Sequence, residues 1–142
     1  MKRLDHFEER LGKVTLFRAC SKQDLRRIAR LADPDDVKEG ETLVSEGQQG
    51  KELFVIMSGR ATVTRKGRKV ATLGPGDYFG ELAVLNPAPR TATVKANTPM
   101  EVLIVSGREL GVLLAEVPVV ARKLLAGMAL RLQEADSSVF AA

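Results

Sequence analysis

The sequence is poor in the residues that build disulfides, metal sites and stacking platforms. It contains one cysteine, Cys20, one histidine, His6, and no tryptophan. A single cysteine excludes an internal disulfide framework and any site with several thiolate ligands. A single histidine near the N-terminus excludes most histidine metal sites, and Ser-His or Cys-His catalysis elsewhere in the chain. We therefore expect a protein without a metal site.

Long hydrophobic runs are also missing. No apolar stretch approaches the roughly 18 residues that a membrane-spanning helix needs. The first residues, Met1 to Asp5, lead into acidic positions instead of the apolar stretch of a signal peptide. We expect a cytoplasmic protein that does not bind membranes.

The charge balance excludes little. The 22 basic and 18 acidic side chains give a net charge of +4, which suits a small anionic ligand and does not by itself indicate nucleic acid. Aromatic residues make up only 4%, so a stacking platform for single strands is not expected. The basic run Arg65-Lys66-Gly67-Arg68-Lys69 predicts a solvated hairpin tip, with a patch for a phosphate backbone as the alternative. We expect no direct binding of nucleic acid.

What is present suffices for one folded domain. The chain has 142 residues, 44% of them apolar and 28% charged, which is typical of a globular domain with a core of its own. We expect residues 1–142 to form a single domain. Its patterning divides into N-terminal helices (1–33), a β-barrel (36–105) and C-terminal helices (107–136).

Two N-terminal helices are predicted. The first follows apolar residues at helical spacing, namely Leu4, Phe7, Leu11 and Val14. The second begins after Ser21, a good N-cap, with Asp24 in its positive first turn, and it ends before Pro34.

From Asp36 the apolar pattern becomes that of short strands. The β-rich segments, separated by glycines, are Val37–Lys38, Thr42–Val44, Leu53–Met57, Ala61–Arg65, Lys69–Leu73, Ala92–Lys95 and Met100–Val105. Gly74-Pro75-Gly76-Asp77 predicts a type II turn, capped by Asp77. Seven or eight short strands with regular turns predict an antiparallel sandwich or barrel.

The C-terminal part returns to a helical pattern. Ser106-Gly107-Arg108-Glu109 is a capping box, and Pro118 starts a second, longer helix. That helix carries a wide apolar stripe, which suits packing on the barrel or on a partner helix. Its members are Val117, Ala121, Leu124, Met128 and Leu132, widened by Val120 and Leu125.

The residues from Gly80 onward interrupt the strands with one predicted helical turn. Gly80 permits a close approach of the backbone to another group. Glu81, Leu82 and Ala83 are first-turn residues, whose N–H groups have no partner within the helix. Those donors and the helix dipole favour a bound anion.

An acid and an arginine flank this turn. Pro87 and Pro89 end it and return the chain in extended form, so that Arg90 comes back toward Glu81. A surface pair of this kind would contribute only about 0–1 kcal/mol if the two groups merely met each other. Held apart, the carboxylate accepts hydrogen bonds from hydroxyls and the guanidinium binds an anion through two oxygens. A ribose fused to a cyclic phosphate presents those two groups side by side.

These residues resemble the phosphate-binding cassette of cyclic nucleotide-binding domains. Such domains are the sensors of catabolite-activator-type regulators, of kinase regulatory subunits and of gated ion channels. The resemblance covers the chain from about Leu16 to Leu132. The matching segments are Glu39-Gly40, Glu46-Gly47, Leu53-Phe54-Val55-Ile56 with Gly59, Gly76 to Ala83, and Pro89-Arg90-Thr91-Ala92.

The resemblance implies a fold and a role for each matching residue. The fold is mainly β, an antiparallel jelly-roll barrel (double-stranded β-helix) with N-terminal helices and a C-terminal helical lid. Glu81 with Gly80 would hold the ribose 2′-hydroxyl, and Arg90 would pair with the cyclic phosphate. The remaining ligand-binding positions are Leu82, Ala83, Thr91 and Ala92 at the phosphate, Val70 and Ala71 at the base, and Asp136 in the lid, with Arg131, Ala135 and Ser137 near it.

The identity of the ligand and the downstream partner stay open. The long helix has no aromatic to stack on a base, and Asp136 would accept from adenine or from guanine. We favour cAMP as the ligand, with cGMP as the alternative, and no cofactor. We expect a sensor domain without a helix-turn-helix, and not an enzyme. It would reposition its C-terminal helix when it binds the nucleotide.

Several other functions compete with this one. The chain is expected to act on an unknown effector, with a homodimer through the C-terminal helix as one possibility. It could also be a fragment of a larger transcription regulator or regulated enzyme. A cupin-type metal enzyme is disfavoured because the barrel region contains no histidine. A ligand-free interaction domain is disfavoured because both Glu81 and Arg90 are present.

Overall fold

The computed structural model describes residues 9–80 and 88–140 of the chain. Residues 9–12 are helical, and the helices that follow are η1 (Thr15–Phe17, a 3-10 helix), α2 (Lys22–Leu31), α4 (Gly107–Glu116) and α5 (Pro118–Phe140). The strands are β1 (Asp33–Val37), β2 (Thr42–Val44), β3 (Glu52–Ser58), β4 (Ala61–Arg65), β5 (Arg68–Leu73), β6 (Tyr78–Phe79), β7 (Thr93–Ala96) and β8 (Met100–Ser106).

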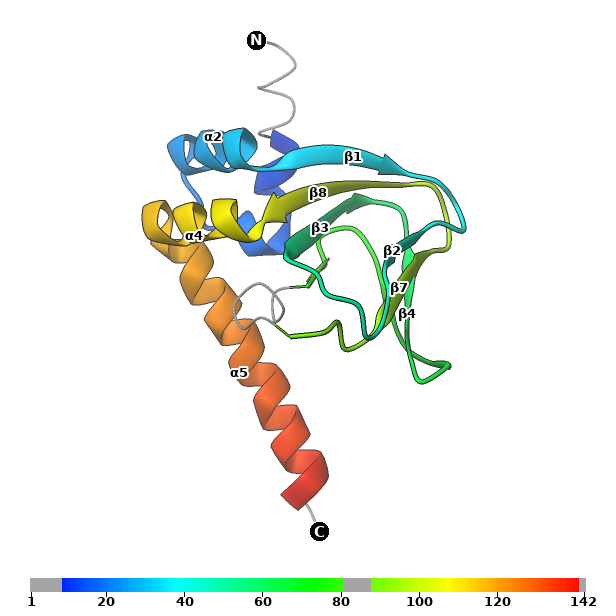
Figure 1. Cartoon of the computed structure of the whole chain (residues 1–142). Helices are drawn as coiled ribbons and strands as arrows, with labels where there is room; N and C mark the ends of the chain where they lie inside the picture. The colour runs from blue at the N-terminus through cyan, green and yellow to red at the C-terminus, as the bar shows by residue number, and fades with distance from the viewer. Residues whose placement is uncertain (1–8, 81–87, 141–142) are drawn as a thin grey trace.

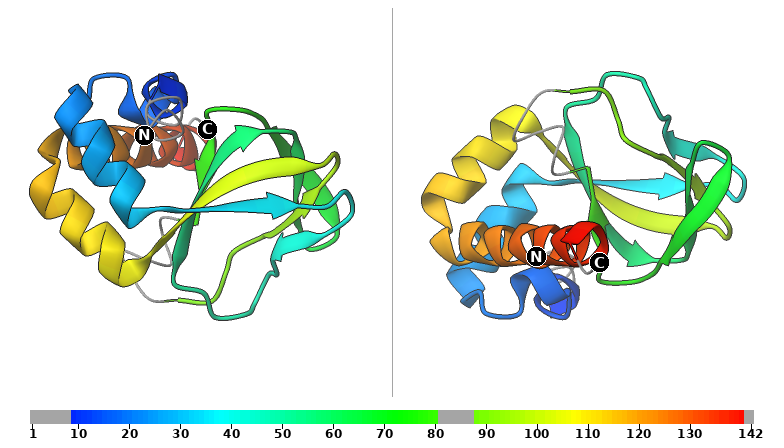
Figure 2. Two further views of the ribbon diagram at one scale, coloured as in Figure 1. Left: turned by 90° about the horizontal axis from the view of Figure 1, so that it is seen from above. Right: turned by 90° about the horizontal axis from the view of Figure 1, so that it is seen from below.

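The strands form two four-stranded sheets, in the orders β1-β8-β3-β6 and β2-β7-β4-β5. All of their pairings are antiparallel. Strands distant in sequence, such as β1 and β8, lie side by side, which is the arrangement of a jelly roll. The helices gather at one end of the sheets, and α5 runs away from α4 along the molecule (Figures 1 and 2). The mainly β fold with flanking helices is therefore confirmed.

The inner strand β3 of the first sheet is buried on both faces. Successive side chains of a strand point to opposite faces. Leu53 and Val55 belong to the hydrophobic cluster under the helices, whereas Phe54 and Ile56 belong to the cluster between the two sheets. The unbroken apolar run Leu53-Phe54-Val55-Ile56 is thus the sequence of a strand covered twice.

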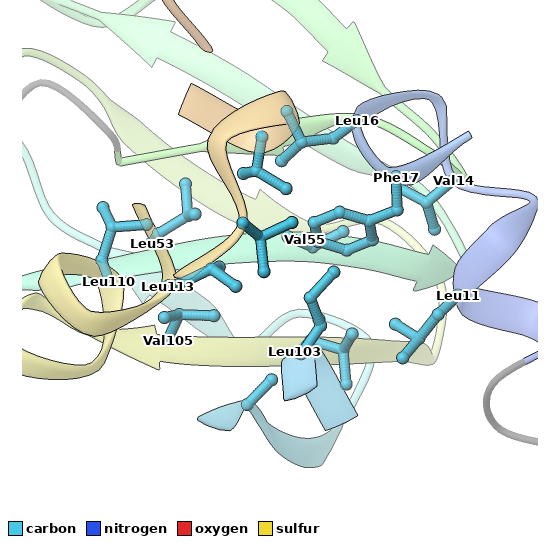
Figure 3. Packing of buried hydrophobic residues seen from close by; sticks show 14 of the residues in the cluster. Leu11, Val14, Leu16, Phe17, Leu53, Val55, Leu103, Val105, Leu110 and Leu113 are labelled. Atoms are coloured by element: carbon cyan, nitrogen blue, oxygen red, sulfur yellow. The ribbon is translucent and has the colours of Figure 1, made fainter. Parts of the chain in front are cut away.

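The helices cover one face of the first sheet (Figure 3). Phe17 of η1, Leu110 and Leu113 of α4 and Leu124 of α5 are buried against Val55, Leu103 and their neighbours. The start of α2 is held by a capping box, because Ser21 Oγ accepts from Asp24 N at 3.1 Å and Asp24 Oδ2 accepts from Ser21 N at 3.3 Å. At α4, Ser106 Oγ accepts from Glu109 N at 3.2 Å, but the hydrogen bonds of the described residues include none from Ser106 N to the Glu109 side chain. The predicted capping box is therefore only half formed.

Three details differ from the sequence-based expectation. β1 begins at Asp33, so the acidic segment before Val37 is an edge strand with four exposed residues, where charge and proline are tolerated. β6 has only two residues, which is too short to show a period of its own. Leu125 does not widen the buried stripe of α5, since it is 61% exposed.

Two other local predictions are confirmed. The turn before β6 has Asp77 N donating to Gly74 O at 3.1 Å, and Asp77 Oδ2 caps it by accepting from Gly74 N at 2.8 Å. The basic run Arg65–Lys69 forms the exposed tip of the β4–β5 hairpin. Within the described residues, no helix is both long and apolar enough to cross a membrane.

Candidate functional site

Arg90 lies just before β7, and the loop before β3 holds its backbone. Arg90 N donates to Gln48 O at 2.9 Å, and Gly47 N donates to Arg90 O at 2.8 Å. The neighbouring residue, Pro89, forms a β-bridge with Gln49. The backbone of Pro89 and Arg90 is therefore held in place by the segment 47–49.

The side chain of Arg90 is buried and directed by two carbonyl groups. Nη1 donates to Gly80 O at 3.2 Å, and Nη2 donates to Glu52 O at 3.0 Å. The residue is 7% exposed, which is rare for an arginine. The carbonyl contacts fix the plane of the guanidinium, which is the preorganisation that two-oxygen binding of a phosphate requires.

Two glycines make room for this guanidinium. A Cβ at Gly50 would overlap Arg90 Nε, so no larger residue fits there without moving the arginine. Gly80 has a φ of +92°, and a Cβ on it would lie 2.7 Å from Arg90 Nη1 and 2.6 Å from Glu52 O. Both glycines are thus required by the position of Arg90.

The guanidinium borders a small cavity. Its volume is about 230 Å³, and its lining includes Arg90, Phe54 and Glu52 together with the segments 42–45 and 48–50. Two other cavities, of about 380 and 640 Å³, lie beside Arg10, and their described lining includes none of the predicted site residues. A choice of the site by cavity size alone would therefore have missed Arg90.

The strand that leads into Gly80 is packed on both sides. Phe79 stacks on Phe54, with ring centroids 4.9 Å apart and ring planes 7° from parallel. Tyr78 packs against the helical cluster, and its hydroxyl lies so near Gly127 of α5 that a Cβ there would be 2.5 Å away. The segment is therefore anchored to the space between the sheets and to α5.

The structure brings Gly80 and Arg90 into contact through the bond from Arg90 Nη1 to Gly80 O. Thr91 is exposed, Ala92 is half-buried, and Thr91 O accepts from Arg65 Nε of the basic hairpin at 3.1 Å. The predicted residues Glu81, Leu82 and Ala83 lie outside the described residues. Asp136 lies on α5, but its side chain is outside the description, as are those of Arg131, Ala135 and Ser137.

The two predicted base-pocket residues are on β5, at the edge of the second sheet. Val70 falls where the β4–β5 register shifts and is 54% exposed. Ala71 pairs with Val63 and is half-buried. These apolar side chains form no hydrogen bonds, so their contact with the base of the nucleotide stays a prediction.

Sequence reasoning missed the groups that hold Arg90. These are the Glu52 carbonyl, the Gln48 carbonyl and the bare Cα of Gly50. Every residue has a backbone carbonyl, so residue type gives no sign of these contacts, and only the glycine pair Gly47 and Gly50 offered a signal.

The described residues hold no group of three or more His, Cys, Asp or Glu side chains that could bind a metal ion.

Comparison with known proteins points to one family. A sequence profile described as "Cyclic nucleotide-binding domain" matches residues 34–116, more than half of the chain. The chain is 38% identical over 94 residues to a cAMP-dependent protein kinase regulatory subunit of Yarrowia lipolytica, a match that covers 65% of this chain and 25% of that protein. It is 27% identical over 137 residues to a CRP-like cAMP-activated global transcriptional regulator of Mycobacterium tuberculosis, which covers 93% and 61% respectively.

A solved structure shows the same likeness. The regulatory domain of Toxoplasma gondii PKA, crystallised with cAMP, superposes with a TM-score of 0.78 at 25% identity and covers 92% of this chain and 51% of that one. In each of these three comparisons the chain spans less than two-thirds of the length of the protein that it matches. The relatives are named as regulatory subunits, regulators and a regulatory domain.

Proposed function

This chain belongs to the cyclic nucleotide-binding domain family, and we propose that it binds a cyclic nucleotide, cAMP in preference, as a regulatory sensor. The observation that carries the proposal is the buried guanidinium of Arg90, held in plane by two carbonyls at the edge of a cavity. Relatives named for cAMP support the choice of nucleotide.

The proposed recognition divides between two groups. Arg90 would neutralise the cyclic phosphate through two of its oxygens, as a charged fork does better than a point charge. Glu81 with Gly80 would accept from the ribose hydroxyl, and Leu82, Ala83, Thr91 and Ala92 would complete the phosphate cradle. Val70, Ala71 and Asp136 would contact the base.

The direct test is titration calorimetry of Arg90→Ala. Hydrogen bonds to a charged group contribute about 1.5–3 kcal/mol each, so we expect cAMP binding to weaken about 10²-fold or more. The matched control is Arg60→Ala, which removes an exposed arginine between β3 and β4, outside the contacts that hold Arg90. Unchanged affinity in Arg90→Ala would remove this residue from the site.

A parallel titration with cGMP decides between the two nucleotides. Binding to cAMP at least 10-fold tighter, about 1.4 kcal/mol, is the expected result. Equal or tighter binding of cGMP would make the chain a cGMP-selective module. Identification by mass spectrometry of a nucleotide captured from a cell extract provides an independent answer.

We further propose that the chain acts on other proteins and is not an enzyme. It would shift α5 on binding, because a ligand moves an equilibrium only by its different affinity for the two states. The effector could be a separate protein or another part of a larger regulator. The cytoplasmic location stays a prediction from the sequence.

A homodimer through α5 is the proposed assembly. Leu125 and Leu130 on this helix are 61% and 57% exposed, and Ala126 and Ala129 beside them are exposed as well. Large exposed aliphatic side chains on one helix are typical of an interface. Light scattering with and without nucleotide, on the parent chain and on Leu125→Glu, is expected to show a dimer only for the parent.

A further inference from the structure

Glu46 lies where three segments around Arg90 meet. Its backbone N donates to Thr93 Oγ1 of β7 at 2.9 Å, and its side-chain Oε1 accepts from Lys66 N at 3.0 Å. Lys66 forms the turn of the basic β4–β5 hairpin, with a φ of +51°. Glu46 therefore links the loop before β3 both to β7 and to the hairpin.

The loop that contains Glu46 is a tight turn. Gln48 N donates to Ser45 O at 3.1 Å, and Gly47 has a φ of +86°. This is the pattern of a type II turn with Glu46 in its second position and Gly47 in its third. The Glu46 side chain anchors this turn to the hairpin.

The same turn determines the backbone position of Arg90. Gly47 N donates to Arg90 O and Arg90 N donates to Gln48 O, so the two segments exchange a pair of hydrogen bonds. A rotation of the turn consequently displaces the backbone that carries the guanidinium. A misplacement of about 1 Å is enough to weaken a directed contact strongly.

We propose that Glu46 is a positioning residue for the Arg90 phosphate site, acting through its hydrogen bond to the hairpin turn. The proposal rests on the proposed function, since it concerns the binding of a cyclic phosphate by Arg90. No contact between Glu46 and the ligand is involved. The residue acts through the turn at Gly47 and Gln48.

The hydrogen bond of Glu46 would strengthen ligand binding, whereas its negative charge would weaken it. A carboxylate repels an anionic ligand, so removal of the charge alone would strengthen binding. Loss of the hydrogen bond to Lys66 N weakens it. Glutamine loses the charge and keeps an acceptor oxygen, whereas alanine loses both, so the two substitutions separate these effects.

The test measures cAMP affinity by calorimetry for Glu46→Ala and Glu46→Gln. We expect about 5-fold weaker binding for alanine, the equivalent of one hydrogen bond, and affinity within about 2-fold of the parent or slightly tighter for glutamine. Glu39→Ala, which removes an exposed carboxylate between β1 and β2, is the matched control and leaves affinity unchanged. Glu46→Ala that binds as tightly as the parent would overturn the proposal.

A second control separates the hydrogen bond from the charge of its donor residue. Lys66→Gly keeps the N–H, suits the positive φ and removes the cation. It is expected to bind cAMP within about 2-fold of the parent, because the hydrogen bond survives. A loss as large as that of Glu46→Ala would assign the effect to the lysine charge and contradict the proposal.

A double-mutant cycle shows whether Glu46 acts through Arg90. In an Arg90→Ala background, Glu46→Ala is expected to change affinity by less than about 2-fold, because the group that it positions is gone. A full effect in that background would mean that Glu46 influences the ligand by another route.

Amide hydrogen exchange tests the positioning role of Glu46 even if the proposed cyclic nucleotide binding is wrong. Failure of the parent chain to bind either cAMP or cGMP would contradict the proposed function alone. In that case the amide protons of Gly47 and Arg90 are still expected to exchange faster in Glu46→Ala and not in Glu46→Gln or Glu39→Ala. Unchanged exchange in Glu46→Ala would overturn the positioning role by itself.

Discussion

The two sheets of this domain differ in how they are covered. The sheet β1-β8-β3-β6 lies between the helices and the second sheet, so β3 is buried on both faces from Leu53 to Ile56. The sheet β2-β7-β4-β5 is covered on one face, and along β7 the buried Val94 and Ala96 alternate with the exposed Lys95. Both sheets contribute to the core between them, but only the first sheet also packs against the helices, and the second exposes its other face to solvent.

Because of this difference, residues important for stability and residues proposed to bind the ligand lie mostly on different sheets. Arg90 precedes β7, Val70 and Ala71 belong to β5, and the basic hairpin joins β4 to β5, so these parts lie on the half-covered sheet. The guanidinium is held by Glu52, at the start of β3, and by Gly80, which directly follows the edge strand β6 of the covered sheet. A substitution in the second sheet should therefore change ligand binding at a smaller cost in stability.

The same chemical change in both sheets tests this separation most strongly. Val55→Ala in β3 removes a fully buried side chain, and we expect the free energy of unfolding to fall by about 2–3 kcal/mol. Val63→Ala in β4 removes a half-buried one and should cost about 1 kcal/mol or less. Denaturant unfolding of the two variants measures the difference.

Ligand titration of the same pair completes the experiment. Val63 pairs with Ala71, so Val63→Ala should lower cAMP affinity, whereas folded Val55→Ala should keep it. Equal losses of stability in the two variants would show that the sheets do not differ as proposed.

A smaller effect is expected where the segment before Gly80 meets α5. Gly127→Ala places a Cβ 2.5 Å from the Tyr78 hydroxyl, and overpacking of this kind costs about 1–2 kcal/mol. In a Tyr78→Phe background the hydroxyl is absent, and alanine then stabilises the helix by up to about 1 kcal/mol over glycine. Unfolding of the four variants in a double-mutant cycle measures the coupling.

The sign of the Gly127→Ala effect is informative. Destabilisation in the parent and stabilisation in Tyr78→Phe would show that α5 rests directly on the strand leading to Gly80. The same change in both backgrounds would remove this contact as a link between the site and the helix.

The smallest effect concerns Cys20, in the helical layer. Burial, and next the negative charge of Asp24, raise the pKa of its thiol from 9.0 to about 11. The unfolded thiol ionises first, so the stability that this thiol provides is complete below about pH 9 and is lost as the pH rises toward 11. Between pH 8 and 10.5, the denaturant midpoint of the parent should fall more than that of Cys20→Ser. If the denaturant midpoints of the two proteins changed equally with pH, the raised pKa of Cys20 would be contradicted.

Much of the secondary structure was predictable because its signals are local. The predicted bounds of β2 and β4 agree with the structure, as do the Ser21 cap and the start of α5 at Pro118. The exceptions have local causes too. Asp33 to Asp36 are typical of a loop and pair only because β8 offers an edge, and Leu125 shares a helical pattern with buried residues while facing away from the core.

The site was predictable only in part. Arg90 could be named as a candidate from the sequence because a guanidinium near a helical turn that begins at a glycine suits an anion. Its contact with Gly80 O was not expected. The base-pocket role of Val70 and Ala71 comes only from the resemblance to a family and stays a prediction. The holding groups at Gln48, Gly50 and Glu52 were not foreseen, because two of them act through carbonyls that every residue possesses.

The amino-acid sequence alone was enough to predict most of the helices and strands, the Gly74–Asp77 turn, and residue types suited to a cyclic phosphate. These features depend on neighbours a few residues apart, whose periodicity and turn chemistry are visible in the chain. The tertiary structure alone decided which faces are covered twice and how Arg90 is held. Those contacts join Glu52, Gly80 and Arg90 from separate segments, and their meeting depends on strand order and register, which local patterns do not encode.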